Sequence, residues 1–162
     1  MTKLGELYDQ DFVLWTKEQA AALRQAKGAN LPLDWENLAE EIESLGKSDR
    51  RELASQIARI LRHLLKLAAS PSAEPRAGWQ ESIADARAAI HLVLDDSPSL
   101  RREIDQLLRK QAPIAAKRAA DDLARHGEPA QAVWTRIEQG GFTAAQVLGD
   151  WFPDAPGGGQ GR

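Results

Sequence analysis

The stretch that decides the fold is DWENLAEEIESLGKSDRRELASQIARILRHLLKL, residues 34–67. Asp34 is a favoured residue at a helix N-terminus, because its carboxylate accepts hydrogen bonds from amides that lack helical partners. Gly46 follows an apolar residue in the position typical of a helix end. A second helix is expected after Ser48 and should end near Ala69. The stretch therefore predicts a helix, a turn and a helix.

The second of these helices carries a wide apolar face. Its apolar residues recur three and four positions apart, the spacing that places side chains on one side of a helix. They are Leu53, Ile57, Ile60, Leu64 and Leu67, with Ala54, Ala58, Leu61, Leu65 and Ala68 one position later. So broad a face needs several neighbours, and we place this helix at the centre of a bundle.

Further helices are expected on both sides of this stretch. An N-terminal helix begins at Thr16, where Gln19 completes a capping box, and ends at Gly28. Near the C-terminus, Thr143 and Gln146 form a second capping box. The apolar rhythm predicts three other helices, over 79–93, from residue 100 onward and over 130–138.

Pro113 lies inside the helix that is expected from Leu100 onward. Proline has no amide hydrogen, so it removes the helical hydrogen bond to the carbonyl of Arg109. We expect either a kink or a break at this position.

Strand patterns are nearly absent, because Val and Thr are few and no segment alternates apolar and polar residues for long. The predicted fold is all-α, an antiparallel helical bundle of four main helices with short N- and C-terminal helices. Residues 1–153 are expected to form a single domain. Residues 154–162 are expected to form a flexible tail rich in Gly and Pro.

Composition narrows the function classes. The 21 basic and 24 acidic residues are mixed along the chain, which argues against nucleic acid as a partner. The chain has no cysteine, so disulfides, thiolate metal ligands and thiol nucleophiles are excluded. No segment reaches the ~20 apolar residues of a membrane span. We expect a soluble, cytoplasmic protein that does not bind membranes.

One acidic cluster is a candidate functional site. Glu36, Glu40 and Glu43 are spaced i, i+4 and i+7, so they line one flank of a helix, and Arg50 lies just beyond the expected turn at Gly46. The cluster has three interpretations: a structural ion-pair network, an acid/base or divalent-metal site, or a charged docking surface. The structural interpretation is favoured.

Recognised catalytic and cofactor patterns are missing. Carboxylate-bridged di-metal bundles carry Glu-x-x-His, but the positions three before His63, His91 and His126 hold no glutamate. No Gly-x-Ser-x-Gly elbow or phosphate-binding loop is present. No metal, cofactor or catalytic residue is predicted.

An aromatic and acidic arm is the remaining candidate. Tyr8, Phe12 and Trp15 lie among Asp9 and Asp11, before the expected first helix. Such an arm packs either across its own bundle or against a partner. Packing within the molecule is favoured, and a partner surface is the alternative.

Four blocks of the chain resemble a known family. They are YDQDFVLW from Tyr8, DWENLAEEIESLGKSDRREL from Asp34, HLLKL from His63 and DDSPSLR from Asp95. Together they resemble the bacterial family called domain of unknown function twenty-nine, over roughly residues 7–153. The resemblance implies an all-helical fold and carries no established activity or catalytic residues.

The function of the chain therefore stays unknown, with two hypotheses. The preferred one is a non-catalytic protein–protein interaction module that binds another protein or a second copy of itself. The alternative is an enzyme that uses the Glu/Arg cluster, with or without a divalent metal.

Overall fold

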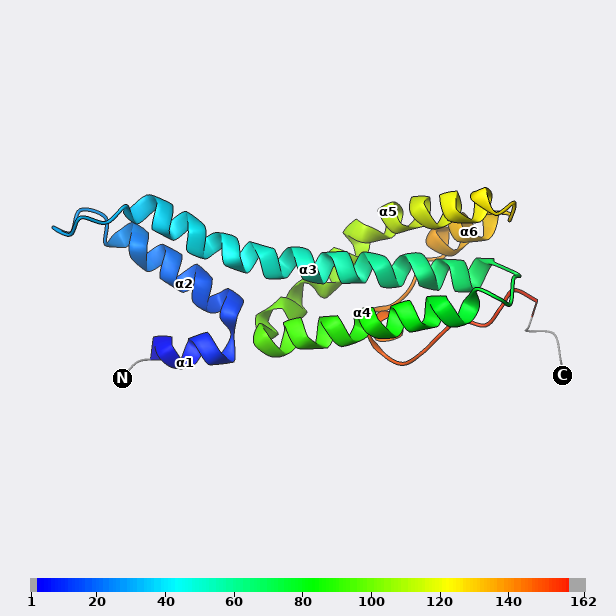
Figure 1. The fold of residues 1–162 in the computed structure, drawn as a ribbon, viewed down its shortest axis with the longest axis horizontal. Helices are drawn as coiled ribbons and strands as arrows, with labels where there is room; N and C mark the ends of the chain where they lie inside the picture. Colours follow the sequence, from blue (N-terminus) through cyan, green and yellow to red (C-terminus); the bar gives the residue numbers. More distant parts are fainter. Residues whose placement is uncertain (1–2, 158–162) are drawn as a thin grey trace. The chain divides into compact units, whose positions relative to one another are not determined.

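The computed structural model describes residues 3–157, and this part of the chain is helical without strands. The all-α prediction is therefore confirmed (Figure 1). In chain order the elements are α1 (Lys3–Gln10), α2 (Phe12–Gln25), α3 (Trp35–Ala69), α4 (Arg76–Asp96), the 3₁₀ helix η1 (Pro98–Glu103), α5 (Ile104–Arg125), α6 (Gln131–Glu138) and α7 (Ala144–Leu148).

The chain divides into two compact units. Unit 1 runs up to Leu53 and adds His91–Glu103, and unit 2 comprises Ala54–Ile90 and the chain from Ile104 onward. Helices α3 and α4 each contribute residues to both units. The single domain expected from the sequence stays a prediction. So does the flexible tail, of which residues 158–162 lie outside the described part of the chain.

In unit 1, α1 packs against α2, and α2 lies beside the first part of α3 (Figure 1). The predicted start of the first helix was wrong. Asp11, not Thr16, caps α2, because its Oδ1 accepts a hydrogen bond from the amide of Leu14 at 2.9 Å. Tyr8, Phe12 and Trp15 therefore belong to helices α1 and α2 and do not form an extended arm.

The predicted turn at Gly46 was also wrong, because α3 runs without interruption from Trp35 to Ala69. At Gly46, α2 approaches α3 closely. A Cβ atom built on Gly46 would lie 2.4 Å from Oγ1 of Thr16, well inside van der Waals contact. The glycine is required by the neighbouring helix and does not end its own.

The core of unit 2 uses the apolar residues of α3 that the sequence pattern singled out. Leu64 and Leu67 are completely buried, and Ile83 of α4 and Leu123 of α5 join them in the core. Helix α5 continues through Pro113, so the structure excludes a break there. The second predicted capping box, at Thr143, is confirmed at the start of α7.

The C-terminal segment is tied to α4 by a buried arginine. The guanidinium of Arg87 donates hydrogen bonds to the carbonyls of Val147, Gln146 and Trp151 at 2.9, 2.8 and 2.7 Å. Arg76 donates in the same way to the carbonyl of Pro153 at 3.1 Å. These bonds hold α7 and the chain after it against α4.

Candidate functional sites

The predicted glutamate cluster pairs with an arginine of α2. Arg24 reaches Glu43 at 2.9 Å and Glu36 at 3.4 Å, and all three side chains are partly exposed. The hydrogen bond from Arg24, with help from Lys47, lowers the pKa of the Glu43 carboxyl. Glu40 is exposed. The two ion pairs of Arg24 join α2 to α3.

Arg50, the fourth member of the predicted cluster, has a different carboxylate. Its Nη2 donates to Oε1 of Glu103 at 2.6 Å, which joins α3 to η1. Arg50 and Glu43 still line a small hollow of about 70 Å³ in unit 1. Glu36 and Glu43 therefore belong to one ion-pair system and Arg50 belongs to another, while Glu40 is placed in neither.

The aromatic residues of the predicted arm form one cluster. The ring of Tyr8 meets Phe12 and Trp15 edge-on, at centroid distances of 5.8 and 4.9 Å, and Phe12 stacks on Trp15 at 5.9 Å. Tyr8 is 52% exposed, so one face of the cluster is open to solvent. The structure thus combines packing within the chain with an exposed aromatic surface.

Beside this cluster lies a hollow of about 400 Å³, which we call the aromatic–aspartate pocket. Its walls are Tyr8, Asp9, Phe12, Asp49 and Asp96. Burial raises the pKa of Asp49, and the negative charge of Asp96 raises it further, while a hydrogen bond from Ser97 lowers it. Among residues 5–157, whose side chains are described, no Lys or Arg is ion-paired with these aspartates. Within that part of the chain, the negative charge of the pocket has no paired cation.

An apolar stripe on α3 leads towards this pocket. Leu38 and Leu45 are 40% and 51% exposed, and Trp35 and Ile42 are half-buried. These residues are spaced three, four and three apart, and Asp49 continues the spacing four positions later. The stripe and the aspartate therefore share one face of the helix.

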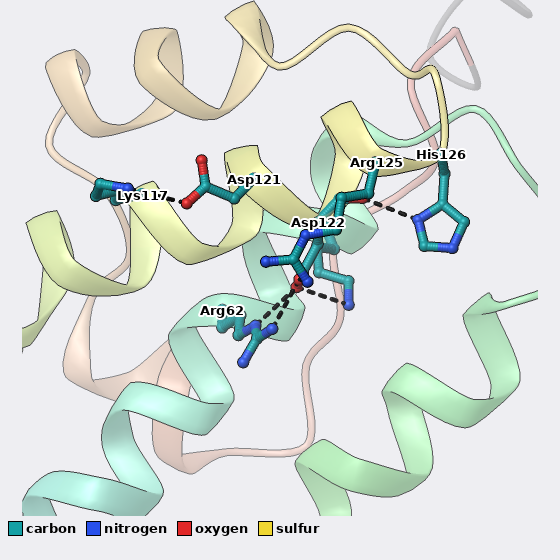
Figure 2. Close-up of polar contacts among 7 residues, drawn as sticks. Arg62, Lys117, Asp121, Asp122, Arg125 and His126 are labelled. Atoms are coloured by element: carbon teal, nitrogen blue, oxygen red, sulfur yellow. Dashed lines mark hydrogen bonds and ion pairs between the residues drawn. The ribbon is translucent and has the colours of Figure 1, made fainter.

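A second polar centre lies in unit 2, around Asp122 of α5 (Figure 2). Arg62 of α3 binds its carboxylate through two hydrogen bonds of 2.7 Å, and Lys66 adds a contact of 3.3 Å. Arg125 lies 4.0 Å away and is mostly exposed. The hydrogen bonds from Arg62, together with Lys66, lower the pKa of Asp122 to about 2. Asp122 is therefore ionised throughout the physiological range.

A hollow of about 760 Å³ opens beside Asp122 in unit 2. We call it the α3–α5 pocket. Its walls are Arg62, His63, Lys66, Ser72, Glu74, Pro75, Trp79, Asp122, Leu123, His126 and Glu128. Nζ of Lys66 lies 4.7 Å from the ring centroid of Trp79. Three helices and two connections thus contribute to one cavity.

Two histidines line the α3–α5 pocket. Burial, reinforced by the positive charges of Lys66 and Arg62, lowers the pKa of His63 to about 4. His63 is therefore uncharged near neutral pH and can accept a hydrogen bond. Nδ1 of His126 lies 2.9 Å from the carbonyl oxygen of Asp122, within hydrogen-bond distance.

Comparison with known proteins places the chain in a family. The sequence pattern described as "Domain of unknown function DUF29" matches residues 7–150. The chain belongs to that family. No curated protein matches it. A solved structure, an alpha-helical protein of unknown function from Rhodospirillum rubrum, is 27% identical, with a TM-score of 0.68. The match covers 87% of this chain and 88% of the other.

The two pockets of this DUF29 chain were not predicted from its sequence. Asp49 and Asp96 lie on different helices, and nothing in their local patterns connects them. Asp122 looked like one of many surface acids, since it follows Asp121 in a polar segment. The sole local signal was Lys66, a charged residue placed between the apolar positions of α3. A lysine there needs a carboxylate partner.

Two further findings concern metal binding and membrane crossing by the described residues of this DUF29 chain. No three of their His, Asp and Glu side chains are grouped so that they could hold a metal ion. None of their helices is long and apolar enough to cross a membrane.

Proposed function

We propose that this chain is a non-catalytic protein–protein interaction module, whose unit 1 binds a basic amphipathic helix of another protein. The observation that carries the proposal is the aromatic–aspartate pocket, which gathers three aspartates that pair with no Lys or Arg of residues 5–157. Carboxylates and aromatic rings together favour a Lys or Arg side chain, through charge and cation–π attraction. A cytoplasmic location belongs to the same proposal.

The apolar stripe of α3 supports a helical partner. Helix-in-groove recognition uses anchors at i, i+3 and i+7, and the stripe offers Trp35, Leu38, Ile42 and Leu45 at matching positions. A partner helix that covers the exposed leucines would bring its own flank towards Asp49. A basic residue on that flank then enters the pocket.

Charge favours a basic partner over a second copy of the chain. Residues 34–45 contain five acidic residues and no basic one, namely Asp34, Glu36, Glu40, Glu41 and Glu43. Arg24 neutralises two of them in part. Two copies that met through this face would place acidic helices against each other, which is unfavourable.

The enzyme hypothesis has less support. It needs the glutamates and Arg50 to act together, but Arg24 engages two of the glutamates and Glu103 engages Arg50. An acid/base role for this cluster stays a prediction without a supporting observation.

Peptide binding tests the proposal. The probes are two fluorescent helical peptides with identical leucines, one with lysine at every polar position and one with glutamate. We expect only the lysine peptide to raise the anisotropy signal. Asp49→Asn and Tyr8→Ala should each weaken its binding about tenfold, the scale of one charged or cation–π contact. Asp85→Asn, an exposed aspartate of unit 2, is the matched control.

Two results would overturn this function. One is equal binding of both peptides, or equal losses in the pocket variants and the control. The other is a stable dimer in light scattering that Leu45→Asp dissociates, which would assign the stripe to self-association instead.

A further inference from the structure

We propose that the α3–α5 pocket of unit 2 binds a small organic anion, a carboxylate or phosphate group carried on an apolar body. The site is separate from the peptide-binding surface proposed for unit 1. Its ligand class follows from the size, the walls and the charge distribution of the cavity.

The cavity has the dimensions of a metabolite site. Its volume of about 760 Å³ lies within the range of roughly 300–1,000 Å³ that small-molecule pockets occupy. Trp79, Pro75 and Leu123 give it an apolar wall. Such a wall suits a ring or a short hydrocarbon body, and the polar groups around it fix orientation.

Cations exceed carboxylates on the helical side of the cavity. Arg62 and Lys66 share the single charge of Asp122, and the side chains of Lys66 and Asp122 are each 11% exposed. One positive charge is therefore left uncompensated in a partly buried place, where charge interactions are stronger than in water. The pKa of His63 is lowered first by burial and then by the positive charges of Lys66 and Arg62, which face the same cavity.

The acidic groups of the cavity come from its connections, away from this cation pair. Glu128 follows α5 and accepts a hydrogen bond from the hydroxyl of Ser72. Glu74 lies in the connection between α3 and α4 and is exposed. Arg62 and Lys66 lie on α3 itself, so the anionic group of a ligand belongs against that helix. The two glutamates disfavour a ligand with negative charge at both ends.

Fluorine NMR on protein labelled with 5-fluorotryptophan tests the site. Trp79 lines the pocket, and the other four tryptophans, Trp15, Trp35, Trp134 and Trp151, serve as internal references. The probes are benzoate and phenyl phosphate, with neutral benzamide and cationic benzylamine as matched controls. We expect both anions to move the Trp79 signal selectively at concentrations up to about 20 mM, the range of fragment affinities. The stronger of the two identifies a carboxylate or a phosphate as the natural group.

A variant pair adds a second test. Lys66→Gln should weaken benzoate binding about tenfold, the effect of one lost charge-assisted contact. Lys117→Gln removes an exposed lysine of the same unit, paired with Asp121 at 3.0 Å, and should leave binding unchanged (Figure 2). If Lys66→Gln does not fold, the probe titrations of the unmodified protein still test the proposal. The proposal is overturned if no probe moves Trp79, or if benzamide or benzylamine moves it as far as the anions do.

Discussion

At the scale of single residues, Gly46 shows how a neighbouring helix decides which side chain is tolerated. Thr16 cannot turn away freely, because its hydroxyl donates to the carbonyl of Val13 at 2.7 Å. A methyl group at position 46 would therefore push α2 away from α3. Glycine inside a helix costs about 1 kcal/mol of stability relative to alanine. The packing of α2 against α3 at Gly46 must therefore stabilise the fold by more than this cost.

We therefore expect Gly46→Ala to destabilise the fold by about 1–2 kcal/mol, the scale of overpacking in a tight contact. Thr16→Ala should remove the obstruction, so that Gly46→Ala costs much less in that background. Urea denaturation of the four proteins of this cycle measures the coupling. Gly78→Ala in α4 is the control, because nothing lies within 4 Å of its missing Cβ, and it should be neutral or stabilising. Additive effects of the two substitutions would contradict the explanation.

His63 gives a pH dependence with a definite sign. Its pKa is lowered from 6.5 to about 4 by burial and by Lys66 and Arg62, so folding disfavours its charged form. The stability of the fold that depends on a neutral His63 is fully present above pH 6.5 and is lost as the pH falls towards 4. Allowing for solvent screening, we expect the loss to be about 1–2 kcal/mol.

His63→Leu tests this expectation, since leucine cannot be protonated and nearly matches the volume. Its free energy of unfolding should fall less between pH 7 and pH 4.5 than that of the parent, by about the same 1–2 kcal/mol. Subtracting the pH profile of His63→Leu from that of the parent removes the contributions of the other groups that titrate in this range. Parallel pH profiles for the two proteins would exclude His63 as the source.

At the scale of elements, the helices were largely predictable and their ends were not. The capping box at Thr143 was found because both of its partners are local in sequence. The cap at Asp11 was missed because two of its three hydrogen bonds come from Ser99, a residue of η1. Gly46 resembled a helix end because local rules cannot register a second helix beside it. Local signals located the segments, and tertiary contacts set their limits.

Asp11 should contribute more than an ordinary helix cap. It accepts from Leu14 within α2 and from the amide and hydroxyl of Ser99 at 2.6 and 2.9 Å, and it is 8% exposed. We expect Asp11→Ala to cost about 2–3 kcal/mol, because it removes three hydrogen bonds at once and leaves partly buried donors unpaired. Asp34→Ala removes an exposed cap, with a bond of 3.3 Å to Asn37, and should cost about 1 kcal/mol or less. Thermal unfolding measures the loss of stability in each variant. Equal losses would show that Asp11 contributes no more than an ordinary helix cap.

The pockets illustrate the same limit. Each brings together side chains from helices that are distant in sequence, so periodicity along one helix cannot find them. Tyr8, Phe12 and Asp9 were singled out in the aromatic and acidic arm, but Asp49 and Asp96, the other two aspartates of the pocket, were not. The acidic flank of α3 was singled out as well, but its main partner, Arg24, was not.

At the scale of the whole molecule, α3 and α4 run through both units. A helix is a cooperative element, so melting one part of it weakens the rest. We expect one unfolding transition for both units, as in most single domains of this size. Asp122→Asn in unit 2 leaves Arg62 and Lys66 without a full countercharge and should cost about 3 kcal/mol.

Reporters in both units can follow this loss. Fluorescence from single-tryptophan variants that retain Trp35 of unit 1 or Trp79 of unit 2 should give the same midpoint, before and after Asp122→Asn. Two separate midpoints, with that of Trp35 unchanged by Asp122→Asn, would show that the units unfold independently. The expectation of a single domain would then be wrong.

The three carbonyls held by Arg87 determine where this protein can be shortened or fused. A chain cut after Phe142 would lack α7 and the segment behind it, and the buried guanidinium would keep its charge without its acceptors. Such a fragment should aggregate on expression, although most of the helices are intact. A reporter attached after Gly157 lies beyond Pro153, the last of the described residues whose carbonyl accepts a hydrogen bond from an arginine, and should leave the helical core undisturbed. The practical boundary for engineering this chain is therefore set by a side chain in α4.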